Sequence, residues 1–308
     1  MLRILTYNIR RFKGKDGESS AAAIGEALAS LRPSLVALNE VDIQSQPEAL
    51  DVVSSRLGGF HVAFFGHVAG RYGNALLSKH PILAVRETHL RGGTEVAFPA
   101  GMRKRNGEIA QEGERHRIVR GLLECDIMLP VAGAGADQGQ VVTVAVTHLD
   151  HIDEGQRAVQ MDHILEALGP NQSRSLLVGD FNALSRSDYT AEEWAALEAR
   201  AASQQWAPPT PAHCLDSLSA AGFADAFVTS RGNGPLNQRN QNGDLSSSPD
   251  DSIFTAHVDH PLYRIDYCFF STDLGFAPLS ASVRSEIRLS DHFPVVFDFR
   301  APPAEARL

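Results

Sequence analysis

Polar residues stand repeatedly at the ends of apolar runs in this chain of 308 residues. The set comprises Asn8, Glu40, His148, Asp180, Asn182, Asp266, Asp291 and His292. Taken singly, each has an ordinary structural explanation, as a turn residue or as a core histidine whose hydrogen bonds are satisfied. Carboxylates and amides at the edge of a core are unfavourable unless they find partners, and one divalent cation serves several of them at once. The recurrence therefore favours one shared site.

The donor atoms of this set indicate which chemistry such a site would carry out. Oxygen donors dominate and thiolates are absent, which favours Mg²⁺, with Mn²⁺ as a substitute, over zinc. Histidines beside carboxylates suit proton transfer and stabilisation of an anionic transition state near neutral pH. Hydrolysis of a phosphate ester needs this combination: a metal on the phosphate oxygens, a base for water, and donors that face the developing charge.

The elements that must position these residues are short strands alternating with helices. Nine runs rich in β-forming residues predict strands over 2–9, 35–42, 61–66, 74–79, 118–129, 141–149, 175–182, 263–271 and 294–299. Apolar stripes predict helices near 24–31, 50–57 and 157–168, and Thr190 with Glu193 predicts a capping box that opens another. Polar segments at 91–117, 133–139 and 230–251 read as surface loops, with no fresh set of strands beyond them. We expect one α/β domain over residues 1–300 and a short tail over 301–308.

Composition excludes several classes of protein. The chain has 28 basic and 37 acidic residues and a net charge of −9, which disfavours a protein that coats nucleic acid, although a nucleic-acid substrate held through a metal remains possible. Its three cysteines show no CxxC spacing, and we expect Cys125 and Cys268 in the core. The N-terminal run is too short for a signal peptide and no stretch is long enough for a membrane helix, so we expect a soluble, cytoplasmic protein without a membrane partner. The oligomeric state stays open.

Seven segments along the chain resemble, in order, the motifs of the endonuclease/exonuclease/phosphatase (DNase I-like) superfamily of metal-dependent phosphoesterases. They are TYN, NEVD, GNALLSKHPI, THLDH, GDFNA, RIDY and SDHFPV, and the match spans residues 3 to 299. GDFN and SDH in this order and spacing are the most specific of them. The resemblance implies a four-layer α/β sandwich, with two mixed β-sheets face to face, helices outside and the active site at one edge. It also implies that Glu40 is a metal ligand, with Asn8 and Asp291 beside it.

The same resemblance suggests roles for the catalytic residues. Asp180 would orient or deprotonate the attacking water with the help of Asn182. His292 would contact the scissile phosphate, and Asp266 would hold the imidazole of His292 in the required tautomer. His148 would donate to a phosphate oxygen or assist the leaving group.

Further residues are candidates for contacting the substrate. They are Asn74, as a donor on the phosphate side, Arg71, Arg264 and the basic cluster of Arg103, Lys104 and Arg105. Arg264 could equally form a structural salt bridge, and a mixed charge run is usually a solvated surface. Arg157 and Gln160 follow THLDH on a predicted helix, where we expect them to brace the histidine loop.

Several functions remain in competition at this point. The leading one is a Mg²⁺-dependent phosphoesterase that acts by direct water attack on a phosphodiester or phosphomonoester. A DNA or RNA nuclease is the first alternative, less favoured because the long loops contain few aromatic residues, and a lipid phosphodiesterase is less favoured because no membrane-docking helix is evident. A non-catalytic binding module on the same fold is disfavoured because Asp180, Asn182 and His292 are all present.

Overall fold

A computed structural model describes residues 1–14, 17–98, 101, 104, 108–130, 139–204, 207–231 and 253–301, with the side chains of residues 170 and 171 excepted. Residues 133–138 of the predicted turn, nearly all of the predicted loop at 230–251 and the expected tail after residue 301 lie outside these residues, and Gly139 begins a strand. Within them, no helix is both long and apolar enough to cross a lipid bilayer.

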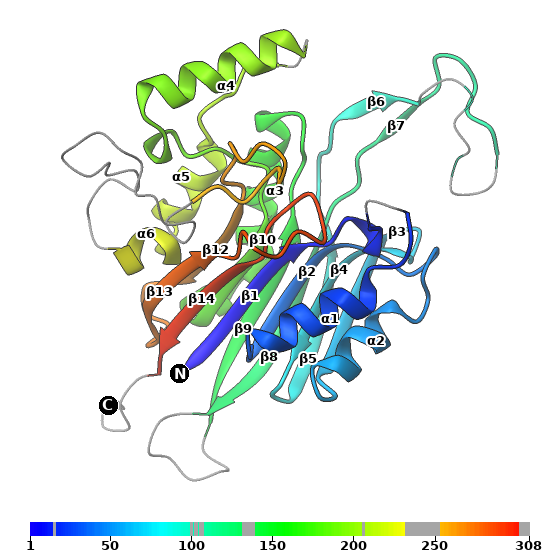
Figure 1. The fold of residues 1–308 in the computed structure, drawn as a ribbon. Helices are drawn as coiled ribbons and strands as arrows, with labels where there is room; N and C mark the ends of the chain where they lie inside the picture. The colour runs from blue at the N-terminus through cyan, green and yellow to red at the C-terminus, as the bar shows by residue number, and fades with distance from the viewer. Residues whose placement is uncertain are drawn as a thin grey trace.

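Two mixed sheets of six strands each form the body of the molecule (Figure 1). The first has the order β13 (Ala277–Val283), β14 (Val295–Arg300), β1 (Leu2–Asn8), β2 (Leu35–Asp42), β4 (Tyr72–Ser78) and β3 (His61–Val68). The second has the order β11 (Phe223–Asp225), β12 (Asp266–Ser271), β10 (Ser175–Asp180), β9 (Gly139–His148), β8 (Gly121–Pro130) and β5 (Ile82–His89). A separate pair, β6 (Glu95–Ala97) and β7 (Arg115–Arg117), projects away from both sheets.

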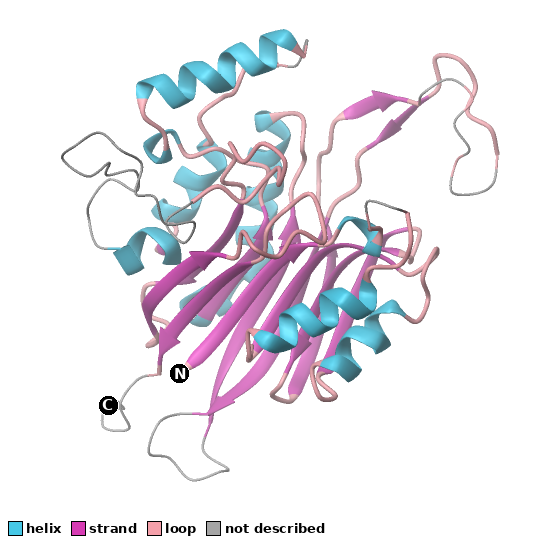
Figure 2. Ribbon diagram, in the orientation of Figure 1, coloured by secondary structure: helices cyan, strands magenta, loops and turns pink. Residues whose placement is uncertain are grey.

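Helices cover the outer faces of the two sheets (Figure 2). The α-helices are α1 (Ala21–Ser30), α2 (Ala49–Arg56), α3 (Glu154–Leu168), α4 (Ala191–Ser203), α5 (His213–Ala220) and α6 (Ala226–Arg231). The 3₁₀ helices are η1 (Arg10–Phe12), η2 (Gly169–Arg174) and η3 (Arg186–Asp188). Side chains of α1 and α2 pack on the first sheet, and those of α3 and α5 pack on the second.

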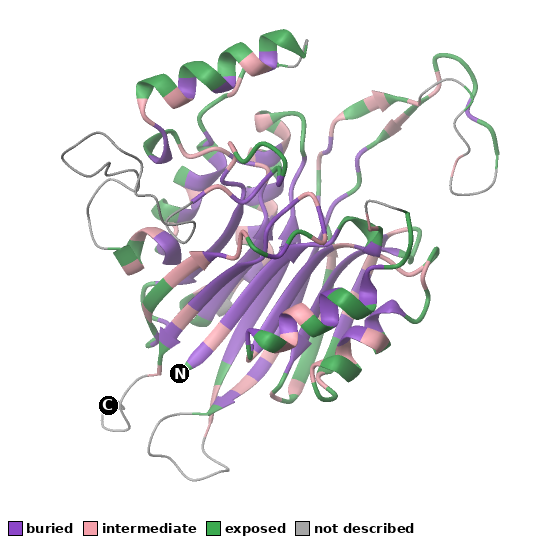
Figure 3. Cartoon of the chain, viewed as in Figure 1, coloured by how far each residue is buried: buried purple, intermediate pink, exposed green. Residues whose placement is uncertain are grey.

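Burial on both faces explains why the central strands are nearly continuous apolar runs. Along β1, Ile4 lies in the core between the sheets, whereas its neighbour Leu5 lies in the core beneath α1 and α2. Successive side chains of a strand point to opposite faces, so a strand between two apolar layers is apolar throughout. Figure 3 shows the result, with the central strands buried along most of their length. The four-layer α/β sandwich expected from the sequence is therefore confirmed.

The nine predicted strands are all present, and five further strands were missed. β5, β11 and β13 lie at sheet edges, where β5 and β13 have almost no buried residues and so lack the continuous apolar pattern of the centre. The β6–β7 pair lies in a segment predicted as a loop. The capping box at Thr190 and Glu193 is confirmed, and Cys125 and Cys268 are buried as expected.

Candidate active site

The predicted catalytic residues meet at one edge of the sandwich because of the strand directions. β1 runs parallel to β2, and β9 runs parallel to β10, so that Asp180 at the end of β10 stands in register with His148 at the end of β9. β12 is antiparallel to β10 and begins opposite Asp180, at Asp266. Parallel neighbours end at the same edge of a sheet, which brings residues far apart in the chain together.

A β-bulge presents Glu40 at this edge. Leu38 of β2 pairs with Ala75 of β4 and Val41 pairs with Gly73, which leaves Asn39 and Glu40 opposite a single residue. Glu40 itself has a φ of 59°, in the left-handed region that non-glycine residues seldom adopt. Bulges re-aim side chains beside functional sites, and such backbone strain is characteristic of them.

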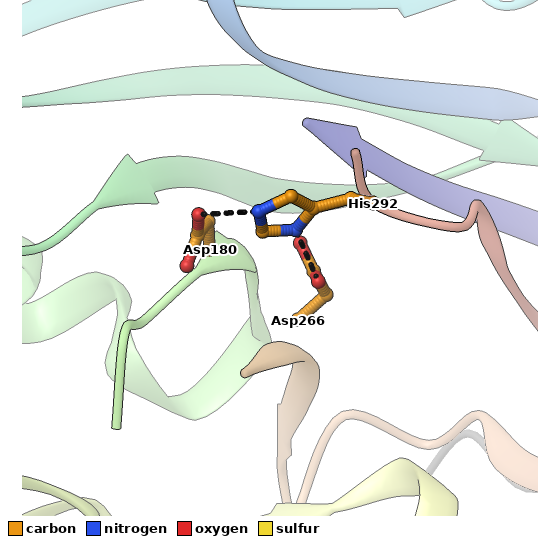
Figure 4. A group of neighbouring side chains, drawn as sticks. All are labelled: Asp180, Asp266 and His292. Carbon is orange, nitrogen blue, oxygen red and sulfur yellow. Dashed lines mark hydrogen bonds and ion pairs between the residues drawn. The ribbon is translucent and has the colours of Figure 1, made fainter. Parts of the chain in front are cut away.

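His292 is held by a buried carboxylate. Its Nδ1 lies 2.8 Å from Oδ2 of Asp266, and its Nε2 lies 3.8 Å from Oδ2 of Asp180 (Figure 4). Burial alone would lower the pKa of His292, but the charge and hydrogen bond of Asp266 outweigh it and raise the pKa to about 10. A protonated imidazole that donates from Nδ1 to Asp266 presents its Nε2–H to the site.

Asp180 lies at the centre of the group. Its Oδ2 accepts from Nδ2 of Asn8 at 3.0 Å and lies 3.6 Å from Nε2 of His148, and its Oδ1 accepts from the backbone N–H of Asn182 at 3.0 Å. Burial raises the pKa of Asp180 to about 7, with the charge of Asp266 adding to the effect. A carboxylate with such a pKa exchanges a proton near neutrality.

An amide pair behind the site overturns one sequence prediction. Asn39 accepts from the backbone N–H of Asp180 at 2.9 Å, and its Nδ2 donates to the carbonyl of Thr147 and to Oδ1 of Asn74, each at 2.9 Å. Asn74 in turn donates to the carbonyl of Gly121 at 2.9 Å and has no exposed surface. The prediction that Asn74 faces the phosphate is therefore wrong, because its amide joins the two sheets.

Arg264 is also not a substrate contact, and the alternative of a structural salt bridge is correct. Its guanidinium is buried, lies 2.7 Å from Asp188, contacts Asp225 and lies 4.4 Å from the ring centre of Tyr267. A buried cation needs compensating charge, and these two carboxylates supply it.

The other predicted arginines are not placed in the site. Arg71 is exposed and is absent from the lining of the pocket at this edge. Of the basic cluster, Arg103 and Arg105 lie outside the described residues, and Lys104 forms an ion pair with Glu114 at 2.5 Å.

A pocket of about 620 Å³ opens over the catalytic group. It is lined by Asn8, Glu40, His148, Asp180, Asn182, Asp291 and His292 together with Arg11, Val68, Tyr72, Phe98, Lys104, His116, Arg117, Ile118, Val119, Arg120, His151 and His257. All the predicted metal ligands and all the predicted catalytic residues except Asp266 line it, and Asp266 lies behind His292.

Sequence reasoning missed several polar residues of this pocket, among them Arg120, His151 and His257. Arg120 is buried, with its guanidinium nitrogens 3.4 Å from Nδ1 of His148 and 3.2 Å from Nδ1 of His151, and no carboxylate among the described residues pairs with it. His257 places its ring 6.1 Å from that of His292. The sequence did contain a signal for Arg120, which is the only arginine inside the apolar run at 118–129. Nothing in the sequence around His257 marked it as a site residue.

The histidine loop is braced as expected. The backbone N–H of Asp150 donates to Gln160 at 2.8 Å, and Arg157 donates to the carbonyl of Asp150 at 3.0 Å. The side chain of Asp150 accepts from the backbone N–H and the hydroxyl of Thr94, at 2.8 and 2.9 Å. These bonds hold the loop that carries His148.

The chemistry of the donor set fits a hard divalent cation. Glu40, Asn8 and Asp291, each with a side-chain oxygen, all line the pocket, and Nδ2 of Asn8 donates to Oε1 of Glu40 at 3.2 Å. A second group, Asp180, Asp266 and His292, has ligand atoms within 4.8 Å of one another. Oxygen-rich sets of this kind suit Mg²⁺ or Mn²⁺.

Comparison with known proteins gives a family and a fold. The model of the Endonuclease/Exonuclease/phosphatase family matches residues 5–292. A Bacteroides vulgatus endonuclease/exonuclease/phosphatase aligns with a TM-score of 0.64 at 16% identity, over 97% of this chain and 98% of its own. The mannosyl-6-phosphatase of Bacteroides thetaiotaomicron aligns at 0.61 and 16% identity (97% and 100%), and the human Nocturnin catalytic domain with bound sulfate aligns at 0.57 and 18% (97% and 93%). No curated protein matches the sequence.

Proposed function

The chain belongs to the Endonuclease/Exonuclease/phosphatase family, and from that premise we propose that it is a metal-dependent phosphoesterase acting by direct attack of water. The substrate would be a phosphodiester or a phosphomonoester. The observation that carries the proposal is the position of Asp180, a buried carboxylate of raised pKa between the Nε2 atoms of His148 and His292. Perturbed groups gathered in one pocket are typical of catalytic sites.

Glu40, Asn8 and Asp291 would hold the cation, which we propose to be Mg²⁺ with Mn²⁺ as a substitute. When bound, the cation would neutralise charge on the nonbridging oxygens of the phosphate. The bulge at Glu40 supports this assignment, because it directs a carboxylate out of the sheet edge at the cost of left-handed backbone. Asp291 stands beside them, with Oδ2 only loosely paired to Arg10 at 3.7 Å.

Asp180 would take the proton of the attacking water. The N–H of Asn182 holds its Oδ1, so that Oδ2 is the oxygen available toward the pocket. A pKa raised to about 7 by burial makes this carboxylate a stronger base than an exposed aspartate. Asn8, which donates to the same Oδ2, would orient it.

The two histidines would present N–H donors to the phosphate oxygens. Nδ1 of His292 is used by Asp266, which leaves a charged Nε2–H. His148 would also present an Nε2–H, but as a neutral ring, because burial and the neighbouring Arg120 lower its pKa. The guanidinium of Arg120 can only donate, so Nδ1 of His148 accepts and the ring proton is on Nε2. Donors fixed before the reaction stabilise charge that develops in the transition state.

Two alternatives remain. A nuclease would use the same residues on a longer substrate, and the net charge of −9 does not favour one. A non-catalytic module would keep the fold without activity, and the complete set of Asp180, Asn182 and His292 in one pocket argues against it. The structural neighbours are only 16 to 18% identical to this chain, so their named activities do not identify its substrate.

Hydrolysis of bis-p-nitrophenyl phosphate and p-nitrophenyl phosphate tests the proposal. We expect turnover of at least one ester with Mg²⁺ or Mn²⁺, none with EDTA, and recovery when the metal is returned. Asp180→Asn, purified in the same way, controls for contaminating phosphatases. Folded protein that hydrolyses neither ester with either metal, or that is fully active in chelator, would contradict the proposal.

A further inference from the structure

The β6–β7 arm, residues 94–118, forms one wall of the pocket, and we propose that it is a subsite for a planar, uncharged ring attached to the phosphate ester. The structure describes residues 94–98, 101, 104 and 108–118 of this arm. The phosphate part of this inference rests on the proposed function, while the ring subsite depends on the arm itself. No part of the catalytic chemistry above uses it.

The arm is fixed at its base and extends beyond the sheets. Its two strands pair only with each other, and Figure 1 shows them projecting from the edge at which β9 and β10 end. The bonds from Thr94 to Asp150 tie the arm to the loop of His148. Gly93 has a φ of 110°, and a Cβ there would lie 2.0 Å from the carbonyl oxygen of Ile118, so only glycine permits this close entry. The arm is therefore placed relative to the catalytic residues.

An aromatic and aliphatic strip lies on the pocket-facing part of the arm, beside the charged side chains of Lys104 and Arg117. Phe98 and His116 stack with ring centres 4.1 Å apart and an angle of 24° between their planes, and both line the pocket. Ile118 and Val119 continue this surface toward Arg120, and Val119 is 38% exposed although it is apolar. An aromatic and aliphatic wall beside a set of charged groups suits a ligand with an apolar, flat part next to a phosphate.

Charge on the arm argues against a second phosphate or a long polyanion as the occupant. Lys104 and Arg117 line the pocket, but Lys104 lies 2.5 Å from Glu114 and Arg117 lies 3.2 Å from Glu95. Each cation already has a carboxylate partner on the same arm. The arm therefore adds flat surface to the pocket rather than net positive charge.

The size of the pocket is consistent with a small ligand. A volume of about 620 Å³ lies in the range of pockets that enclose whole small molecules. Stacking of a planar ring on an aromatic side chain contributes enough that alanine substitution weakens binding by about tenfold or more. A nucleobase and a simple aryl group share this chemistry, and an alkyl chain does not.

The test compares esters that differ only in the group next to the phosphate. If monoesters are hydrolysed, kcat/KM is measured for AMP, ribose 5-phosphate, benzyl phosphate and hexyl phosphate, which all release an alcohol. If only diesters are hydrolysed, thymidine 5′-(p-nitrophenyl phosphate) is compared with methyl, benzyl and hexyl p-nitrophenyl phosphate, which all release p-nitrophenol. We expect the ring-bearing esters to be preferred about tenfold or more. If AMP or the thymidine diester is hydrolysed faster than the benzyl ester, the subsite prefers a nucleobase. If the two are hydrolysed equally well, the subsite accepts any planar ring.

Three variants on the arm test whether the preference for rings depends on the planar face of Phe98 or only on its apolar volume. Phe98→Ala and Phe98→Leu should both lower the preference for rings, because leucine keeps the bulk and loses the flat face. Ile109→Ala is the matched control, since Ile109 lies on the same arm, is 60% exposed and does not line the pocket. It should keep the preference.

Binding measured by calorimetry keeps the two proposals distinguishable. AMP and ribose 5-phosphate are titrated into wild-type protein with Mg²⁺, where AMP should bind about tenfold or more tightly even if nothing is hydrolysed. Equal binding of the two, equal use of ring and hexyl esters, or loss of preference in Ile109→Ala as large as in Phe98→Ala would overturn the ring subsite. Failure to hydrolyse any ester would instead count against the phosphoesterase assignment alone.

Discussion

Replacement of Asp266 by asparagine is the perturbation whose consequences can be worked out most fully. The substitution keeps the shape of the side chain and removes the charge that lies 2.8 Å from Nδ1 of His292. Without it, burial lowers the pKa of His292 and only the charges of Asp180 and Asp291 still raise it, so we expect the pKa to fall to about 6.5 or below. At pH 7.5 the protonated fraction of His292 would fall from nearly all to under about one tenth.

This change in protonation sets the expected magnitude. Loss of the charged form alone lowers kcat about tenfold at pH 7.5, and loss of the fixed ring orientation brings the total to about 100-fold. The metal requirement should change little, because Asp266 lies behind His292 rather than in the pocket lining. The alkaline limb of the pH–rate profile should move to lower pH, because His292 then loses its proton at a lower pH than in the wild type.

Stability should depend on pH in a defined direction. A histidine whose pKa is raised in the folded protein contributes stability that is fully present below about pH 6.5 and is lost as pH rises through about 10. Asp266→Asn lacks this contribution, so it should be less stable than wild type by on the order of 3–5 kcal/mol near pH 6, and the difference should shrink toward pH 10.

Three measurements examine this reasoning. NMR titration of His292 in chelator-treated protein reports its pKa directly, and urea unfolding at several pH values reports the stability difference. A double-mutant cycle with His292→Ala reports the coupling, because Asp266→Asn should cost little once the ring is gone. An unchanged titration of His292, or a double mutant that loses the full product of both single effects, would refute the assignment and indicate that Asp266 acts independently.

Other predictions follow from the same geometry. Glu40→Gln should raise the Mg²⁺ concentration for half-maximal activity about tenfold or more, as measured by metal titration, and an unchanged requirement would remove Glu40 from the metal site. Asp180→Asn should lower kcat about 100-fold or more while the thermal midpoint stays within a few degrees of wild type, and inactivity caused by unfolding would count against a catalytic role. Asn39→Ala should destabilise the protein by about 2–4 kcal/mol in urea unfolding, because the N–H of Asp180 and the carbonyl of Thr147 lose their buried partner. A smaller loss would mean that these groups find other partners.

The sequence by itself determined the central strands and the residues that end them. Asn8, Glu40, His148 and Asp180 follow runs that are apolar on both faces, a pattern that depends only on local order along the chain. Because parallel strands end at one edge, these residues could be assigned to a common site before any contact was known. The helix-capping box and the bracing role of Arg157 were accessible for the same reason, since their partners lie within a few residues.

Only the tertiary structure shows the roles of residues whose partners are distant in the chain. Arg264 pairs with Asp188, 76 residues away, and Asn39 bonds to a carbonyl 108 residues away, so nothing near either residue could tell burial from exposure. Arg120 enters the site because β8 lies beside β9, which carries His148, and His257 enters because its segment meets that of His292. A polar side chain becomes structural or functional according to what the packing of the two sheets places against it, and that packing is a property of the whole chain.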